Sequence, residues 1–109
     1  MFEKGTMRDI GIDITLKGNP GHVLAPNDWD MVLAVKFKKI NIEEYQKWYL
    51  DLLAKRWQTR KKEFLDLAKE GLNKDIRLKC FCHKNDTFCH AHLAAKFMNR
   101  LVDKIRDLA

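Results

Sequence analysis

The residues of this chain that could do chemistry gather in one short segment. All three cysteines and three of the four histidines fall within residues 80–92, CFCHKNDTFCHAH. The pattern places this segment where a strand ends and a helix begins. That junction joins the carboxyl end of a strand, the usual binding position in open α/β sheets, to the free amides and partial positive charge of a helix N-terminus. The sequence therefore predicts a site there.

Binding of a small anionic or nucleotide-like ligand is the first chemistry that suits these residue types. Amides at the helix start and histidine side chains would hold a phosphate or carboxylate group. The residues predicted to bind the ligand are Cys82, His90 and His92, with Trp29 as a candidate wall of the pocket.

A metal site is the second chemistry. Thiolates and imidazoles suit zinc, and Cys82, Cys89, His90 and His92 supply four ligands. The spacing, Cys-x-Cys-x6-Cys-His-x-His, differs from the Cys-x2-Cys pairs of zinc ribbons and fingers. Zinc is therefore an alternative to the anionic ligand.

A thiol-dependent enzyme is the third chemistry, with Cys89 as the catalytic residue. A cysteine in the first turn of a helix has its thiolate stabilised by the amides and the dipole, and His90 or His92 could act as acid or base. The alternative to all three chemistries is a purely structural role, since a free cysteine packs in a core as a small hydrophobic residue. Cys80 continues the apolar face of Ile76 and Leu78, so we expect it in the core.

The same segment resembles a signature of small bacterial and phage domains of unknown function. In those domains a strand ending in Cys-aromatic-Cys precedes a short loop and a Cys-His at a helix start, as in Cys80-Phe81-Cys82 and Cys89-His90 here. The resemblance implies a compact α/β fold with the Cys-His loop as the suspected site. Some members have Arg after the Cys-His, where this chain has Ala91, so a guanidinium that could bind an anion is missing.

A basic stretch supplies a different alternative, a metal-stabilised module that binds nucleic acid. The net charge is +6. Phosphate contacts would come from Lys55, Arg56, Arg60 and Lys61, with Trp57 stacking on bases. A solvated helix face with Trp57 in the core is the simpler interpretation of the same pattern.

The elements that must position these residues follow from periodicity. Alternating apolar residues at 10–16, a Gly-Asn-Pro-Gly turn and an apolar run at 22–25 predict a hairpin, with His22 as an exposed turn residue. Asn27-Asp28 could cap a helix, although the apolar run 31–35 also suits a strand. Asn41 and Glu44 form a capping box for one long helix, or for two that join near Thr59. A strand at 76–82 and a helix from residues 88–90 to the C-terminus complete the chain.

These elements predict a single α/β domain over residues 1–109. Its small sheet would contain the hairpin and a parallel third strand, because the long helical connection suits a parallel crossover, and helices would cover it. The longest fully apolar run is far too short to span a membrane, so no membrane partner is expected. An odd number of cysteines without a secretory signal predicts reduced thiols in the cytoplasm.

Overall fold

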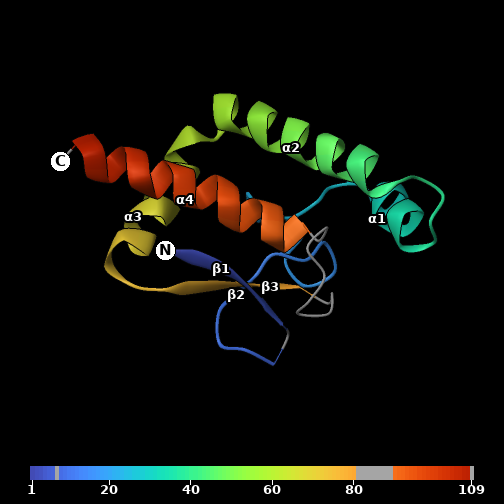
Figure 1. Cartoon of the computed structure of the whole chain (residues 1–109), viewed down its shortest axis with the longest axis horizontal. Coiled ribbons are helices and arrows are strands. Elements are labelled where there is room, and N and C mark those ends of the chain that lie inside the picture. Colours follow the sequence, from blue (N-terminus) through green and yellow to red (C-terminus); the bar gives the residue numbers. More distant parts are fainter. Residues whose placement is uncertain (7, 81–89, 109) are drawn as a thin grey trace.

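A computed structural model describes residues 1–6, 8–80 and 90–108 of the chain (Figure 1). The elements in chain order are β1 (Phe2–Thr6), β2 (Ile12–Asp13), α1 (Trp29–Lys36), α2 (Ile42–Thr59), α3 (Lys61–Asn73), β3 (Ile76–Cys80) and α4 (His90–Leu108). This is the predicted small α/β fold, a sheet covered by helices.

The described sheet has three strands in the order β1-β3-β2, and both pairings are parallel. Phe2 lies opposite Ile76 and Ile12 lies opposite Leu78. The prediction that the strand after the helices is parallel to the N-terminal part of the chain is therefore confirmed. The sequence pattern did not predict β1, and β3 lies between the two N-terminal strands.

The predicted hairpin between residues 10–16 and 22–25 is wrong. Side chains of α2, rather than a strand partner, bind the backbone of the second segment. Tyr49 Oη donates to the carbonyl of Leu24 at 2.6 Å, and Arg56 Nη1 donates to the carbonyls of Val23 and Ala25 at 2.7 and 2.6 Å. Since these three buried carbonyls are satisfied in this way, the apolar run is buried without a ladder.

The helix boundaries follow the predicted caps. Asp28 Oδ1 accepts from the amide of Asp30 at 2.8 Å, and α1 is a helix rather than a strand. Asn41 Oδ1 accepts from the amide of Glu44 at 2.7 Å at the start of α2. The long helical stretch is two helices that meet at Arg60, whose φ of −127° and ψ of 32° interrupt the helical backbone.

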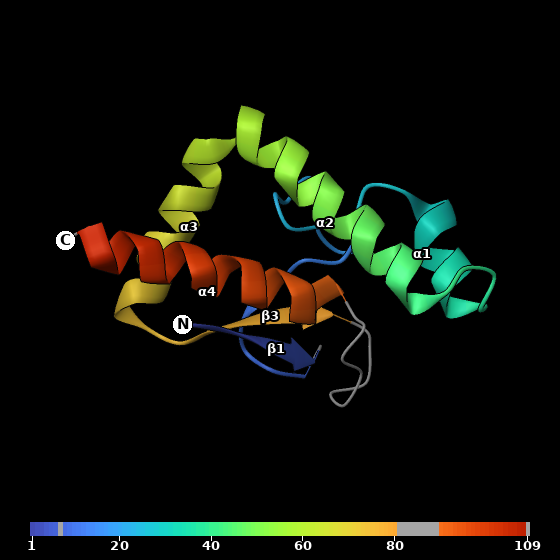
Figure 2. The ribbon, with the colours of Figure 1, turned by 45° about the horizontal axis from the view of Figure 1, so that its top comes forward.

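The core lies between the sheet and the helices. α4 packs along one face of the sheet and also contacts α2 and α3 (Figure 2). Ile76, Leu78 and Cys80 are buried in this core, whereas Arg77, which points to the opposite face of β3, is exposed. The prediction that Cys80 is a core residue is confirmed. None of the described helices is long and apolar enough to cross a membrane.

The opposite face of the sheet is charged. Arg77 forms ion pairs with Glu3 at 3.0 Å and with Asp9 at 2.7 Å. The chain between β1 and β2 passes over β3 at this face. A Cβ at Gly11 would lie 2.2 Å from the carbonyl oxygen of Arg77, so only glycine fits this crossing.

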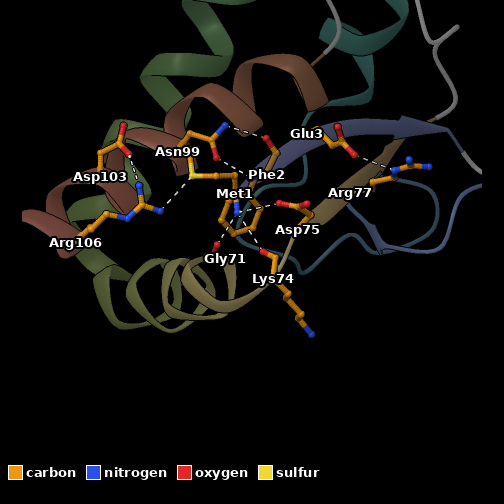
Figure 3. Close-up of polar contacts among 10 residues, drawn as sticks. All are labelled: Met1, Phe2, Glu3, Gly71, Lys74, Asp75, Arg77, Asn99, Asp103 and Arg106. Atoms are coloured by element: carbon orange, nitrogen blue, oxygen red, sulfur yellow. Dashed lines mark hydrogen bonds and ion pairs between the residues drawn. The ribbon is translucent and has the colours of Figure 1, made fainter.

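Side chains also cover the outer edge of β1. Asn99 of α4 accepts from the amide of Phe2 at 2.6 Å and donates to its carbonyl at 2.9 Å (Figure 3). Asp9 accepts from the amide of Thr6 at 2.6 Å, and the amide of Asp9 donates to the carbonyl of Thr6 at 3.0 Å. These bonds occupy backbone groups at both ends of the strand that could otherwise pair with another chain.

The ammonium group of Met1 lies at the carboxyl end of α3. It donates to the carbonyls of Gly71 and Lys74 at 2.5 and 3.1 Å and lies 3.7 Å from a carboxylate oxygen of Asp75 (Figure 3). A positive charge at this end of a helix is favourable because the last carbonyls lack helical partners.

Candidate anion-binding site

The carboxyl ends of all three strands lie at one edge of the sheet because both pairings are parallel. β1, β2 and β3 end at Thr6, Asp13 and Cys80, and α4 begins with His90. The predicted site residues Cys82 and Cys89 lie outside the described residues. The described part of the site has two sides, the strand ends and the first turns of α4.

The turn after β2 is held by its own side chains. The backbone amide and hydroxyl of Thr15 donate to Asp13 Oδ1 at 2.8 and 2.7 Å, and Thr15 Oγ1 accepts from the amide of Gly18 at 2.8 Å. Thr15 is buried. A Cβ at Gly18 would lie 1.9 Å from a carboxylate oxygen of Asp13, so a larger residue there would displace the side chain that holds the turn. This turn fixes the backbone next to Ile14.

His90 joins the start of α4 to that turn. The residue is buried, with 8% of its surface exposed, and Nε2 lies 3.0 Å from the carbonyl oxygen of Ile14. A carbonyl only accepts, so Nε2 carries the hydrogen in this contact. The ring also packs edge-on against Tyr49, with centroids 5.6 Å apart. The structure thus gives His90 a structural contact, and a ligand or metal at Nε2 would have to displace it.

His92 lies in a basic surrounding. Its side chain is half-buried, and burial, together with the positive charges of Lys96 and Lys4, lowers its pKa from the ordinary value of 6.5. Lys96 follows one turn later on α4, whereas Lys4 comes from β1, more than eighty residues away in sequence. The charges of two lysines, one on the same helix and one on the strand that packs against it, thus act on His92.

The N-terminal part of α4 adds to this positive potential. Its first turn, which runs from His90 to Leu93, contains no acidic residue, and the acidic residues of α4 lie in its last turns. The helix dipole places partial positive charge at the same end. We call His92, Lys96 and Lys4, at this end of α4, the basic cluster.

Sequence reasoning found His92 but missed both lysines of the basic cluster. The spacing of Lys96, four residues after His92, could have indicated that they share a helix face. Lys4 could not be found in this way, because β1 was not predicted and its pairing joins distant parts of the chain.

No metal centre is visible among the described residues. Within residues 1–6, 8–80 and 90–108, no three His, Cys, Asp or Glu side chains lie close enough to hold one ion. The zinc hypothesis also needs Cys82 and Cys89, so it stays a prediction.

Trp29, the candidate pocket wall, begins α1 and is 49% exposed. α1 packs against α2. This position gives Trp29 no demonstrated contact with the basic cluster in the part of the chain that the structure describes.

The predicted nucleic-acid surface is partly occupied by structural contacts. Arg56 binds the carbonyls of Val23 and Ala25, and Arg60 Nη2 donates to the carbonyl of Gly21 at 2.9 Å. Arg60 also forms two hydrogen bonds with Glu63. Lys61 Nζ lies 5.0 Å from the ring centroid of Trp57, and Lys55 is exposed. Two of the four predicted phosphate contacts thus hold the fold together.

A shallow hollow of about 400 Å³ lies between α3 and residues 19–23, and none of its lining residues belongs to the basic cluster. Its carboxylates, Glu63, Asp66 and Glu70, do not suit an anion. His22 lines it and is half-buried rather than exposed as predicted, because its Nδ1 accepts from the amide of Leu24 at 3.1 Å. Burial, then the charge of Arg60, lowers the pKa of His22.

The basic cluster is thus the strongest described candidate for binding an anion, and its setting beside three parallel strand ends is common for ligand sites. No family model, curated protein or solved structure matches the chain.

Proposed function

We propose that this chain binds a small anionic ligand, a phosphate or the phosphate group of a nucleotide-like molecule, at the basic cluster. The observation that carries the proposal is the placement of three basic residues: Lys96 follows His92 by one turn of α4, and β1, which carries Lys4, packs against α4. Burial, then the charges of Lys96 and Lys4, lowers the pKa of His92. A bound anion would offset the effect of these positive charges on the protonated imidazole.

The sequence hypothesis also assigns Cys82 and Cys89 to this site, and both lie outside the described residues. His90 supports the site by fixing the start of α4 against Ile14. The likeness to small bacterial and phage domains of unknown function stays a prediction that the same loop is the functional site in both.

The pKa of His92 gives the proposal a pH dependence with a definite sign. Burial and then the charges of Lys96 and Lys4 disfavour the protonated imidazole, whereas a bound anion favours it. Anion binding therefore raises the pKa of His92, and by linkage the affinity increases as the pH falls through that pKa. Sulfate is the suitable probe, because its charge stays constant between about pH 5 and about pH 8.

The test is a titration with phosphate, sulfate and a nucleoside monophosphate, followed by the NMR signals of the His92 ring. We expect saturable shifts, with about two- to fivefold weaker binding for Lys96→Gln and for Lys4→Gln. Lys104→Gln is the matched control, since it removes one exposed charge from the far part of α4. Equal affinities for Lys96→Gln and Lys104→Gln, or no movement of the His92 signals, would reject the proposal.

The nucleotide-like part of the proposal depends on the comparison between probes. A nucleoside monophosphate should bind more tightly than phosphate if the site also contacts a base or sugar. Equal binding would restrict the ligand to a small anion. Zinc analysis of protein purified without chelator, and thiol labelling of Cys89 against pH, test the two remaining sequence hypotheses separately.

A further inference from the structure

α1 exposes an apolar stripe that the proposed anion site does not use. Trp29, Leu33 and Phe37 are 49%, 41% and 65% exposed. They are spaced four residues apart, so they lie along one face of the helix and of the turn that ends it. α1 lies at one end of the molecule beside the start of α2, which begins with Ile42, itself 48% exposed (Figure 2).

The two ends of this stripe carry opposite charges. Asp28 and Asp30 lie at the N-terminal end of α1, and Lys38 and Lys39 lie just after its C-terminal end. Asp30, Lys38 and Lys39 are exposed. Lys38 adopts a φ of 59°, and the amide of Lys39 donates to the carbonyl of Ala34 at 2.8 Å, so a tight helix-ending turn fixes the basic end relative to the stripe.

We infer that a second copy of this chain docks on the stripe, with the two α1 helices antiparallel about a two-fold axis at Leu33. In this arrangement Leu33 faces Leu33 of the second copy. Trp29 and Phe37, each four residues from the axis, face one another across the interface. The acidic end of each helix meets the basic end of the other, and the two helix dipoles point in opposite directions, which is favourable.

The charges favour a second copy over a lipid surface. A membrane rich in anionic lipid would attract the lysines, but the same end of the molecule also exposes Asp30, Glu43 and Glu44. α1 itself is acidic at its N-terminal end and basic just after its C-terminal end, so it is complementary to a second α1 that is turned by a half-rotation.

The size of the stripe makes the association weak. The three side chains of the stripe and the neighbouring Ile42, each about half exposed, present roughly 400 Å² per copy, at about 100 Å² each. The total is below that of a standard stable interface, so we expect a dissociation constant between about 10 µM and about 1 mM.

Sedimentation velocity across that concentration range tests the inference on the unmodified chain. We expect a concentration-dependent shift from monomer to dimer. Leu33→Gln and Phe37→Gln should each weaken dimerisation by about tenfold or more, with unchanged far-ultraviolet circular dichroism. Leu50→Gln is the matched control, since Leu50 is a 42% exposed leucine on α2 outside the stripe.

A charge exchange tests the antiparallel arrangement. Asp30→Lys alone and Lys39→Glu alone should each weaken the dimer, whereas the double variant should recover most of the lost affinity because opposite charges again meet. A monomer up to about 1 mM, a dimer that tolerates Leu33→Gln and Phe37→Gln, or a double variant no better than the single ones would overturn the inference. So would binding to phosphatidylserine vesicles by a chain that stays monomeric.

Discussion

Arg56→Met is the sharpest test of how this chain uses its basic residues. The Arg56 guanidinium is half-buried between α2 and residues 23–25, where a single nitrogen donates to the carbonyls of Val23 and Ala25 at 2.7 and 2.6 Å. Val23 and Ala25 are 3% and 0% exposed. Methionine keeps an unbranched stem of similar bulk but has no donor. The substitution therefore leaves two carbonyls in a buried segment without their partner.

The expected cost follows from these two bonds. A hydrogen bond to a charged group contributes about 1.5–3 kcal/mol, and a buried polar group that loses its partner costs about 1–3 kcal/mol. Since the guanidinium is only half-buried, water can replace part of what is lost. We therefore expect Arg56→Met to lower the free energy of unfolding by about 2–3 kcal/mol, a large share of the stability of a small domain.

Urea unfolding followed by tryptophan fluorescence measures this loss. Lys55→Met is the control, because it removes the same charge one residue earlier, from an exposed side chain, and should change the free energy of unfolding by less than about 0.5 kcal/mol. Equal losses for the two variants would refute the reasoning. So would an Arg56→Met protein of normal stability that lost salt-dependent binding to nucleic acid, because Arg56 would then be a phosphate contact.

Three further variants test other features. Gly11→Ala should lower the free energy of unfolding by about 2 kcal/mol or more, because its Cβ would lie 2.2 Å from the backbone oxygen of Arg77. Gly21→Ala is the control and should cause no such loss, since no atom lies within 4 Å of a Cβ at Gly21. Equal melting temperatures for the two variants would contradict the prediction. Lys38→Gly should raise stability by about 0.5–1 kcal/mol in urea unfolding, since φ at Lys38 is 59°, and Lys39→Gly should give no gain. Burial lowers the pKa of His22 in the folded chain below 6.5, so the unfolded chain takes up a proton first as the pH falls. The free energy of unfolding therefore decreases as the pH drops below about 6.5. His22→Asn should make this decrease smaller in urea titrations at successive pH values, and an unchanged pH dependence would contradict the prediction.

The helices could be predicted because their signals are local. Asp28 and Asn41 cap α1 and α2 through bonds to amides two or three residues away, and a short pattern contains both partners. The alternation of Ile76, Leu78 and Cys80 likewise predicted one buried face of β3. Each of these features depends on residues that are close in sequence.

The sheet could be predicted only in part because its contacts are distant in sequence. β1 contains one large apolar side chain, Phe2, which packs closely against Gly71 of α3. No local pattern reports that contact. The apolar run at 22–25 predicts a strand, but Tyr49 and Arg56 satisfy its carbonyls from a helix. Such side-chain bonds are invisible to a periodicity argument.

The candidate site likewise combines features that local sequence predicts with features that depend on distant contacts. The clustering of cysteine and histidine predicted the strand-to-helix junction, and His92 lies in the basic cluster there. His90 is a ligand candidate by residue type. In the structure, however, its Nε2 binds the carbonyl of Ile14, a contact that the incorrectly predicted hairpin does not suggest. Lys4 joins the cluster only through the pairing of β1 with β3.

The position of β3 between β1 and β2 also has a consequence for synthesis on the ribosome. Both N-terminal strands emerge early, but each pairs with a strand that starts at Ile76. Until β3 leaves the exit tunnel, β1 and β2 have no partner strand and their backbone groups stay unpaired, whereas α2 and α3 can already form from local contacts. We expect the sheet to be the last layer to assemble, and the nascent chain to be most prone to aggregation during that interval.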